Sequence, residues 1–233
     1  MKPTLNYFST FILCLMLSIQ CVYAQSGTYH TIQDFESWSS INLKYKPTKK
    51  IKLNVSQQLR LKDNSSNLDA YFTQVGIDYK LNKQFSIGLA TRYITENDDQ
   101  GKITGNEYHL RWQGDLEYKN KINRASIEGR IRYQSKDELR ITTDNLKKVI
   151  RFKLGLGYNI PNWKLDPTFS SEIFNNLTTE DGLYRIRYTL QTSYDLAKQS
   201  KLGIFIRTEK GLVGEHPKRT NILGLKYNFI IKK

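Results

Sequence analysis

Residues 51–62 read IKLNVSQQLRLK, and apolar and polar side chains alternate along this stretch. Five of its six odd positions, from Ile51 to Leu61, are apolar, with Gln57 as the exception. Every even position, from Lys52 to Lys62, is polar. A period of two is typical of a β-strand with one apolar face, because successive side chains of a strand point to opposite sides.

The same alternation recurs along the chain, and eleven such stretches are visible. Their apolar faces begin, in order, at Ile41, Ile51, Tyr71, Phe85, Tyr108, Ile127, Ile150, Trp163, Tyr184, Leu202 and Leu223. No stretch after the N-terminal region shows the 3.6-residue period of an amphipathic helix. We therefore expect a single all-β domain over residues 25–233.

The N-terminal region has the features of a secretory signal. Lys2 precedes an apolar stretch from Phe8 to Ile19, and Val22-Tyr23-Ala24 then precede Gln25. This order of charged, apolar and small residues predicts cleavage after Ala24, so that residues 1–24 are removed. The chain's two cysteines, Cys14 and Cys21, lie in this segment, which excludes disulfides and thiol chemistry from the predicted mature protein.

Strand length and tyrosine placement distinguish a membrane barrel from a soluble one. Most alternating stretches run for about ten to thirteen residues, close to the length a tilted strand needs to cross a bilayer. Tyr71 and Tyr79 bracket Val75 and Ile77 on one apolar face, as expected for aromatic girdles at two membrane boundaries. Short connections, among them a tight turn at residues 160–162, alternate with longer polar ones. These features predict a transmembrane antiparallel up-and-down β-barrel in the bacterial outer membrane.

Strand number follows less directly from the pattern. Bacterial single-chain barrels usually have an even number of strands, so eleven visible strands imply one more or one fewer. We expect twelve, with residues 26–35 closing the barrel against residues 220–231. The alternative is ten strands, in which residues 26–35 plug the lumen and the segments flanking Pro167 do not form a full strand each. A bulge is expected at Pro167, because proline has no N–H to donate.

Three segments resemble a known family of exported barrels. They are Asp34-Phe35-Glu36-Ser37-Trp38, the strand pair formed by residues 49–63 and 68–79, and Gly129-Arg130-Ile131-Arg132-Tyr133-Gln134. Together they resemble the family catalogued as domain of unknown function 2490. The resemblance extends over nearly all of the predicted mature chain. It implies an outer-membrane barrel and implies no activity, cofactor or substrate.

The formal net charge of the chain is +14. An exported protein meets lipid phosphates and anionic solutes, so the charge does not indicate a nucleic-acid partner. The expected partners are outer-membrane lipids, lipopolysaccharide and the outer-membrane insertion machinery. No cofactor is expected, and the oligomeric state is left open.

Arginines recur at polar positions in the half of each strand that lies toward the longer loops. With the short turns placed in the periplasm, these arginines gather in the outer half of the lumen. Together with Arg60, they are Arg92, Arg111, Arg130, Arg132, Arg151, Arg185, Arg187 and Arg207. The planar guanidinium suits phosphate and carboxylate, which predicts a narrow pore or binding barrel for small anions. The alternative is a structural or interaction barrel whose lumen is filled, with Glu96, Glu172 and Glu209 neutralising part of the arginine set.

Candidate catalytic groups are sparse. The histidines are His30, His109 and His216, too scattered to predict a metal site. Ser126 would have to approach His109 to form a lipase-like pair, and no spacing requires that. Asp115, Glu117 and Glu128 could be an acid and base pair, yet arginines share their strand faces and favour ion pairing. We therefore expect no enzyme; a lipid-modifying activity is the third hypothesis.

Overall fold

The computed structural model describes residues 31–99, 104–140, 146–214 and 217–232, which form one β-sheet. Its eleven strands are β1 (Gln33–Lys46), β2 (Ile51–Lys62), β3 (Asn67–Lys80), β4 (Phe85–Asp98), β5 (Gly105–Ile122), β6 (Ala125–Glu138), β7 (Lys147–Tyr158), β8 (Thr168–Asn176), β9 (Leu183–Ala197), β10 (Ser200–Gly211) and β11 (Arg219–Lys232). In these described ranges no helix has the length and apolarity to span a membrane. The predicted signal peptide lies outside the described residues.

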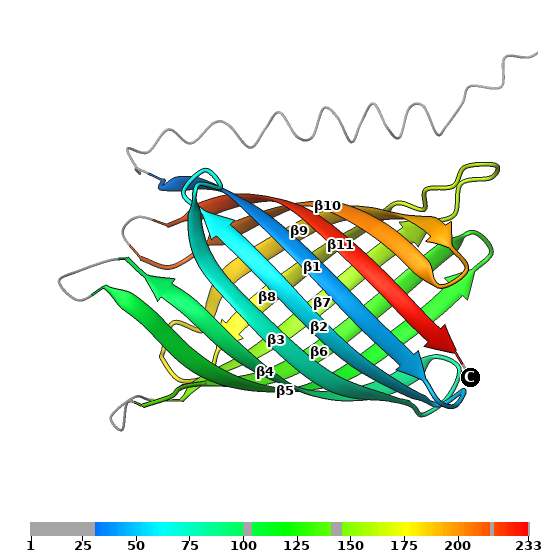
Figure 1. Cartoon of the computed structure of the whole chain (residues 1–233), viewed down its shortest axis with the longest axis horizontal. Coiled ribbons are helices and arrows are strands. Elements are labelled where there is room, and N and C mark those ends of the chain that lie inside the picture. Colours follow the sequence, from blue (N-terminus) through cyan, green and yellow to red (C-terminus); the bar gives the residue numbers. More distant parts are fainter. Residues whose placement is uncertain (1–30, 100–103, 141–145, 215–216, 233) are drawn as a thin grey trace, which may run out of the picture.

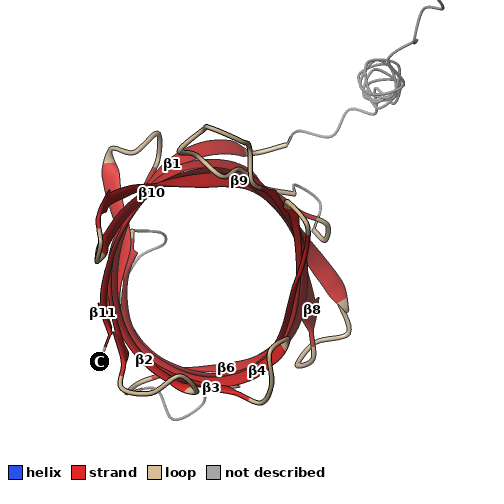
Figure 2. Ribbon diagram, turned by 90° about the vertical axis from the view of Figure 1, so that its right-hand side faces the viewer, coloured by secondary structure: helices blue, strands red, loops and turns tan. Residues whose placement is uncertain are grey.

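The sheet closes into a barrel (Figures 1 and 2). Neighbouring strands pair antiparallel, except that β1 and β11 pair parallel from Gln33 opposite Arg219 to Lys46 opposite Lys232. In Figure 1 the blue β1 and the red β11 lie side by side and point the same way. The prediction of an all-β barrel is confirmed.

The predicted strand number is wrong, as is the alternative of ten. The barrel closes with eleven strands of the described chain, because β1 already pairs with β2 on one side and β11 on the other. No position is left for a strand between β1 and β11. Residues 33–35 of the segment expected as the twelfth strand begin β1, and residues 26–30 of it lie outside the described residues. An odd count requires the parallel seam, since antiparallel pairing throughout needs an even number.

The connections differ between the two ends of the barrel. One end carries residues 47–50, 81–84, 123–124, 159–167 and 198–199. The other carries residues 63–66, 99–104, 139–146, 177–182 and 212–218. Four of the five connections at this second end have six to eight residues, although the longest one, residues 159–167, lies at the first end. Because of the parallel seam, β1 starts at this second end.

The segment around Pro167 departs from expectation. A tight turn at residues 160–162 and a strand bulged at Pro167 were predicted; instead residues 159–167 form a loop and β8 begins at Thr168. Proline lacks the N–H that a paired strand position requires, so the strand begins after it. Its carbonyl still accepts a hydrogen bond from the Tyr158 N–H at 3.1 Å. β8 is consequently the shortest strand described, at 9 residues.

Polar and apolar side chains are distributed across the barrel wall in the reverse of the order found in a soluble barrel. Large apolar side chains point outward along every strand; Leu89 is 68% exposed and Ile206 is 61% exposed. The inward face carries the buried polar side chains, among them His109, Glu172 and Thr189, each 5% exposed. The interior of this barrel is therefore polar and its exterior apolar.

Apolar residues also occur inside the barrel, beside the parallel seam. Trp38 of β1, Phe205 of β10 and Ile222 of β11 form a buried cluster. The Phe205 ring lies so close to Gly224 that a Cβ at that position would overlap it. Gly224 thus makes room for an aromatic side chain that occupies the lumen.

Candidate functional site

The interior of the barrel contains a cavity of about 620 Å³. Fifteen basic and three acidic side chains line it, so its wall is strongly electropositive. The eight arginines that the sequence places in the lumen all line this cavity, as does Arg60. Their placement in the outer half of the lumen and their binding of anions stay predictions. The lining also includes lysines that the sequence analysis did not single out, such as Lys44 and Lys226.

On one side of the lumen, arginines surround a shared carboxylate. Glu172 of β8 accepts hydrogen bonds from Arg130 at 2.7 Å, from Arg151 at 3.1 and 2.8 Å, and from Arg187 at 3.2 Å. Glu209 of β10 pairs with Arg187 at 2.6 Å. We call this group, with the ring of Phe174, the Phe174 cluster. The two glutamates neutralise part of the charge of the three guanidinium groups.

The ring of Phe174 stacks with two guanidinium groups of that cluster and lies near a third arginine, Arg185. The Cζ atoms of Arg151 and Arg187 lie 4.3 and 4.6 Å from its centroid, and that of Arg185 lies at 5.5 Å. Contacts of this kind are attractive because the ring face is electron-rich. The cluster is therefore ordered by stacking as well as by ion pairs.

A second group of arginines surrounds Phe72 of β3. The Cζ atom of Arg92 lies 3.5 Å from the Phe72 centroid, and that of Arg60 lies 5.1 Å from it and 3.9 Å from the Trp38 ring. Arg111 of β5 is directly opposite Arg92 of β4. We call Phe72, Arg60, Arg92 and Arg111 the Phe72 cluster. No carboxylate of the described residues lies within 4.0 Å of these three guanidinium groups, unlike those of the Phe174 cluster.

Glutamines take the place of carboxylates in the Phe72 cluster. Arg92 donates from Nε and Nη2 to the Gln74 Oε1, at 2.9 and 2.7 Å. Arg111 donates from Nη2 to the Gln113 Oε1 at 3.1 Å. A neutral amide oxygen orients a guanidinium and leaves its charge uncompensated. Donors of both arginines consequently remain for a further partner, since each guanidinium has five N–H groups.

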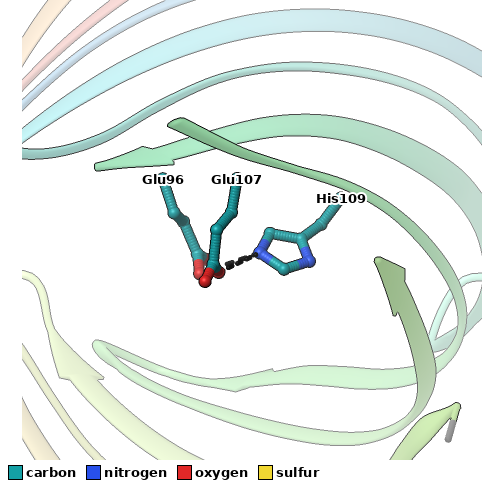
Figure 3. A group of neighbouring side chains, drawn as sticks. All are labelled: Glu96, Glu107 and His109. Atoms are coloured by element: carbon teal, nitrogen blue, oxygen red, sulfur yellow. Dashed lines mark hydrogen bonds and ion pairs between the residues drawn. The ribbon is translucent and has the colours of Figure 1, made fainter. Parts of the chain in front are cut away.

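The structure also gathers Glu96, Glu107 and His109 near the end with the longer loops. Figure 3 shows the two carboxylates and the imidazole pointing toward one another. The His109 Nε2 lies 3.1 Å from the Glu107 Oε2 and 3.2 Å from the Glu96 Oε2. Two carboxylates and a histidine are a donor set suited to a divalent cation. However, Lys136 binds both oxygens of Glu96, at 2.9 and 2.8 Å, and already supplies a positive charge there.

Sequence reasoning missed this triad, although a signal was present. Glu107 and His109 are two positions apart on one strand and so point the same way. Glu96 joins them because β4 pairs with β5 in a register that places Glu96 opposite Glu107. His30 and His216 lie outside the described residues.

The structure separates Ser126 from His109, the pair considered for a lipase-like site. Ser126 is opposite Lys121 and His109 is opposite Glu138, so they lie near opposite ends of the β5–β6 pair. Ser126 and His109 therefore form no catalytic pair in this structure.

The three carboxylates considered as acids or bases have basic partners instead. Asp115 pairs with Arg132 at 2.6 Å, Glu117 with Lys119 at 3.1 Å and Glu128 with Lys153 at 2.6 Å. The sequence anticipated ion pairs here, although two of the partners are lysines where arginines were expected. Asp166 lies in the 159–167 loop, and its Oδ1 accepts a hydrogen bond from the Asn159 side-chain amide at 3.0 Å.

The interior aromatic residues were also missed. Phe174 follows Ile173, and Phe205 stands between Ile204 and Ile206, so each is an apolar residue at a position where alternation requires a polar one. Such out-of-phase aromatic residues were the available signal for rings inside the lumen.

Comparisons with known proteins give matches to solved structures and to one family model. The beta domain of the Bordetella autotransporter Brka, known from a crystal structure, aligns with a TM-score of 0.40 and 10% sequence identity. The alignment covers 78% of this chain and 82% of that chain. Comparison with curated proteins gives no match. A family model described as a protein of unknown function (DUF2490) matches residues 35–210. The chain belongs to this family, the proteins of unknown function DUF2490.

Proposed function

We propose that this protein is an outer-membrane β-barrel whose basic lumen admits and binds small anionic solutes. The observation that carries the proposal is the cavity wall, with fifteen basic side chains against three acidic ones. Concentrated charge of one sign in a recess raises the local concentration of counter-ions. Anions are therefore expected to enter the lumen in preference to cations.

The exterior of the barrel supports a place in a membrane. A closed barrel leaves no unpaired strand edge, which a lipid environment requires, and its outward face is apolar. Leu89, Trp112 and Ile206 are each at least 60% exposed, and water would make that exposure costly. The strands are 9 to 18 residues long, against about 9–11 needed to cross hydrocarbon at a tilt. The proposed environment is thus the outer membrane, with its lipids and lipopolysaccharide as neighbours and the insertion machinery as an assembly partner.

Orientation gives a direct prediction. Long loops of outer-membrane barrels point outward, so the end that carries residues 99–104 is expected on the cell surface. A cysteine introduced by Thr104→Cys should react with a membrane-impermeant maleimide on intact cells. The matched variant Lys49→Cys, in a short turn at the opposite end, should react only after the cells are opened. The reverse pattern would place the longer loops and the start of β1 in the periplasm.

Ion selectivity tests the proposed function. The refolded protein is placed in a planar lipid bilayer with a tenfold gradient of potassium chloride, and the reversal potential is measured. Its sign should indicate that chloride passes more readily than potassium, because the wall of the lumen is basic. A reversal potential that indicates cation preference would contradict the proposal.

The second candidate function is a structural or interaction barrel with a filled lumen. It is favoured by the Phe174 cluster, in which Glu172 is only 5% exposed and three arginines bind it. Such a barrel should show no conductance and no binding of small anions. We also propose that the protein is not an enzyme, and a lipid hydrolysis assay with the refolded barrel tests that separately.

A further inference from the structure

We propose that Arg92 and Arg111 in the Phe72 cluster form a binding site for one small oxyanion, a carboxylate or a phosphate, with Arg60 beside it. The inference deepens the proposed anion binding and rests on it, because it assigns the site within the lumen and the class of ligand.

The first argument is the arrangement of charge. Arg92 and Arg111 are directly opposite on neighbouring strands, where Cβ atoms are about 4.5–5.5 Å apart and like charges are destabilising. The Cζ atoms of Arg92 and Arg60 also lie 3.5 and 5.1 Å from the same Phe72 centroid, so three guanidinium groups share this part of the lumen. A bound anion between Arg92 and Arg111 would turn this repulsion into attraction.

The second argument is a comparison within the barrel. In the Phe174 cluster, Arg151 donates from Nε and Nη2 to the two oxygens of Glu172. In the Phe72 cluster, Arg92 donates from the same two nitrogens, but to the single amide oxygen of Gln74. Both guanidinium groups also lie over a phenylalanine ring. The two clusters thus use the same stacking and the same orienting contact, and only the first contains its own carboxylate.

The third argument concerns preorganisation. Gln74 and Gln113 hold Arg92 and Arg111 by their amide oxygens, and Phe72 supports Arg92 from one side. Arg60 lies between the rings of Trp38 and Phe72, and its buried Nε has no hydrogen-bond partner among the described residues. Arginines fixed before binding lose little side-chain entropy when a ligand arrives. The cluster is therefore built as a receptor and not as a flexible basic surface.

The chemistry of the ligand follows from these donors. Guanidinium groups match planar carboxylates and tetrahedral phosphates through paired N–H donors, and they match chloride less well. The cavity of about 620 Å³ accepts a small solute of either kind. Carboxylate and phosphate share the required oxyanion, so succinate and inorganic phosphate serve as the two probes.

The test introduces a carboxylate into the Phe72 cluster by mutation. Gln74→Glu is nearly isosteric and would give Arg92 the partner that Glu172 gives Arg151. In calorimetric titrations of the refolded barrel, this variant should bind the tighter of the two probes about tenfold more weakly than wild type. Gln113→Glu should weaken binding in the same way through Arg111, and it serves if Gln74→Glu does not refold.

Gln191→Glu is the matched control. Gln191 lines the same cavity from β9, opposite Thr168 and Phe205, so the variant adds the same charge away from the Phe72 cluster. It should weaken binding by less than about threefold, because a distant charge acts through screened electrostatics alone. Equal weakening by Gln191→Glu and Gln74→Glu, unchanged affinity in Gln74→Glu, or wild type that binds neither probe would overturn the assignment.

The outcome is separable from that of the selectivity measurement. If the wild-type barrel prefers chloride but Gln74→Glu binds the probe as tightly as wild type, the proposed function stands and the proposed site is wrong. Probe binding that depends on Gln74, in a barrel without anion preference, supports the site and contradicts the pore.

Discussion

Replacing Glu172 by glutamine is expected to lower the free energy of unfolding by about 3–5 kcal/mol, the range found when one partner of a buried ion pair is removed. The Glu172 side chain is 6% exposed and pairs with Arg130, Arg151 and Arg187. Glutamine offers one acceptor oxygen and turns an NH2 group toward donors. Three guanidinium groups would then repel one another without a shared anion. Urea unfolding of the refolded barrel, followed by tryptophan fluorescence, measures the loss.

Glu128→Gln is the control for that measurement. Glu128 also lines the lumen, but among the described residues its one ion pair is with Lys153, and its side chain is 29% exposed. A more exposed pair contributes at most about 1 kcal/mol, so its loss should be small. If both variants lost the same stability, Glu172 would be an ordinary lumen charge and not the anchor of the Phe174 cluster.

The strands themselves could be predicted from the sequence because alternation is a local property. The stretch from Ile51 to Lys62 that shows the clearest alternation is β2 with the same bounds. Alternation also placed the arginines on the inner face, and all eight named for the lumen line the cavity. Each of these inferences needs only the phase of a residue within its own strand.

The closure of the barrel could not be predicted in the same way. Pairing of β1 with β11 joins residues 186 positions apart, from Gln33 to Arg219, and no local pattern records which strand edges meet. The parity argument assumed antiparallel pairing throughout and therefore added a twelfth strand. With eleven strands, the parallel pairing of β1 with β11 leaves neither strand with an unpaired edge.

The division of the arginines into two groups was also beyond the sequence. Whether an arginine is compensated depends on which strand brings a carboxylate across the lumen. Glu172 meets Arg130 across 42 positions of sequence, whereas Arg92 meets the neutral Gln74 of the adjacent strand. Composition and alternation are alike for both arginines, and only the register of the closed barrel distinguishes them.

The second large loss of stability is expected for a substitution on the outward face of the barrel. Leu190→Arg is expected to lower the free energy of unfolding in a lipid bilayer by about 2–4 kcal/mol, the cost of arginine on the lipid face near the bilayer midplane. Leu190 is 52% exposed on β9 and stands between the outward-facing Phe169 and Ile206. Gln191→Arg, one position further and directed into the lumen, should cost much less because its charge stays in the polar interior. Urea titrations in liposomes compare the two variants. Equal stability of Leu190→Arg and Gln191→Arg would mean that Leu190 does not meet hydrocarbon, and the outer-membrane assignment would fall with it.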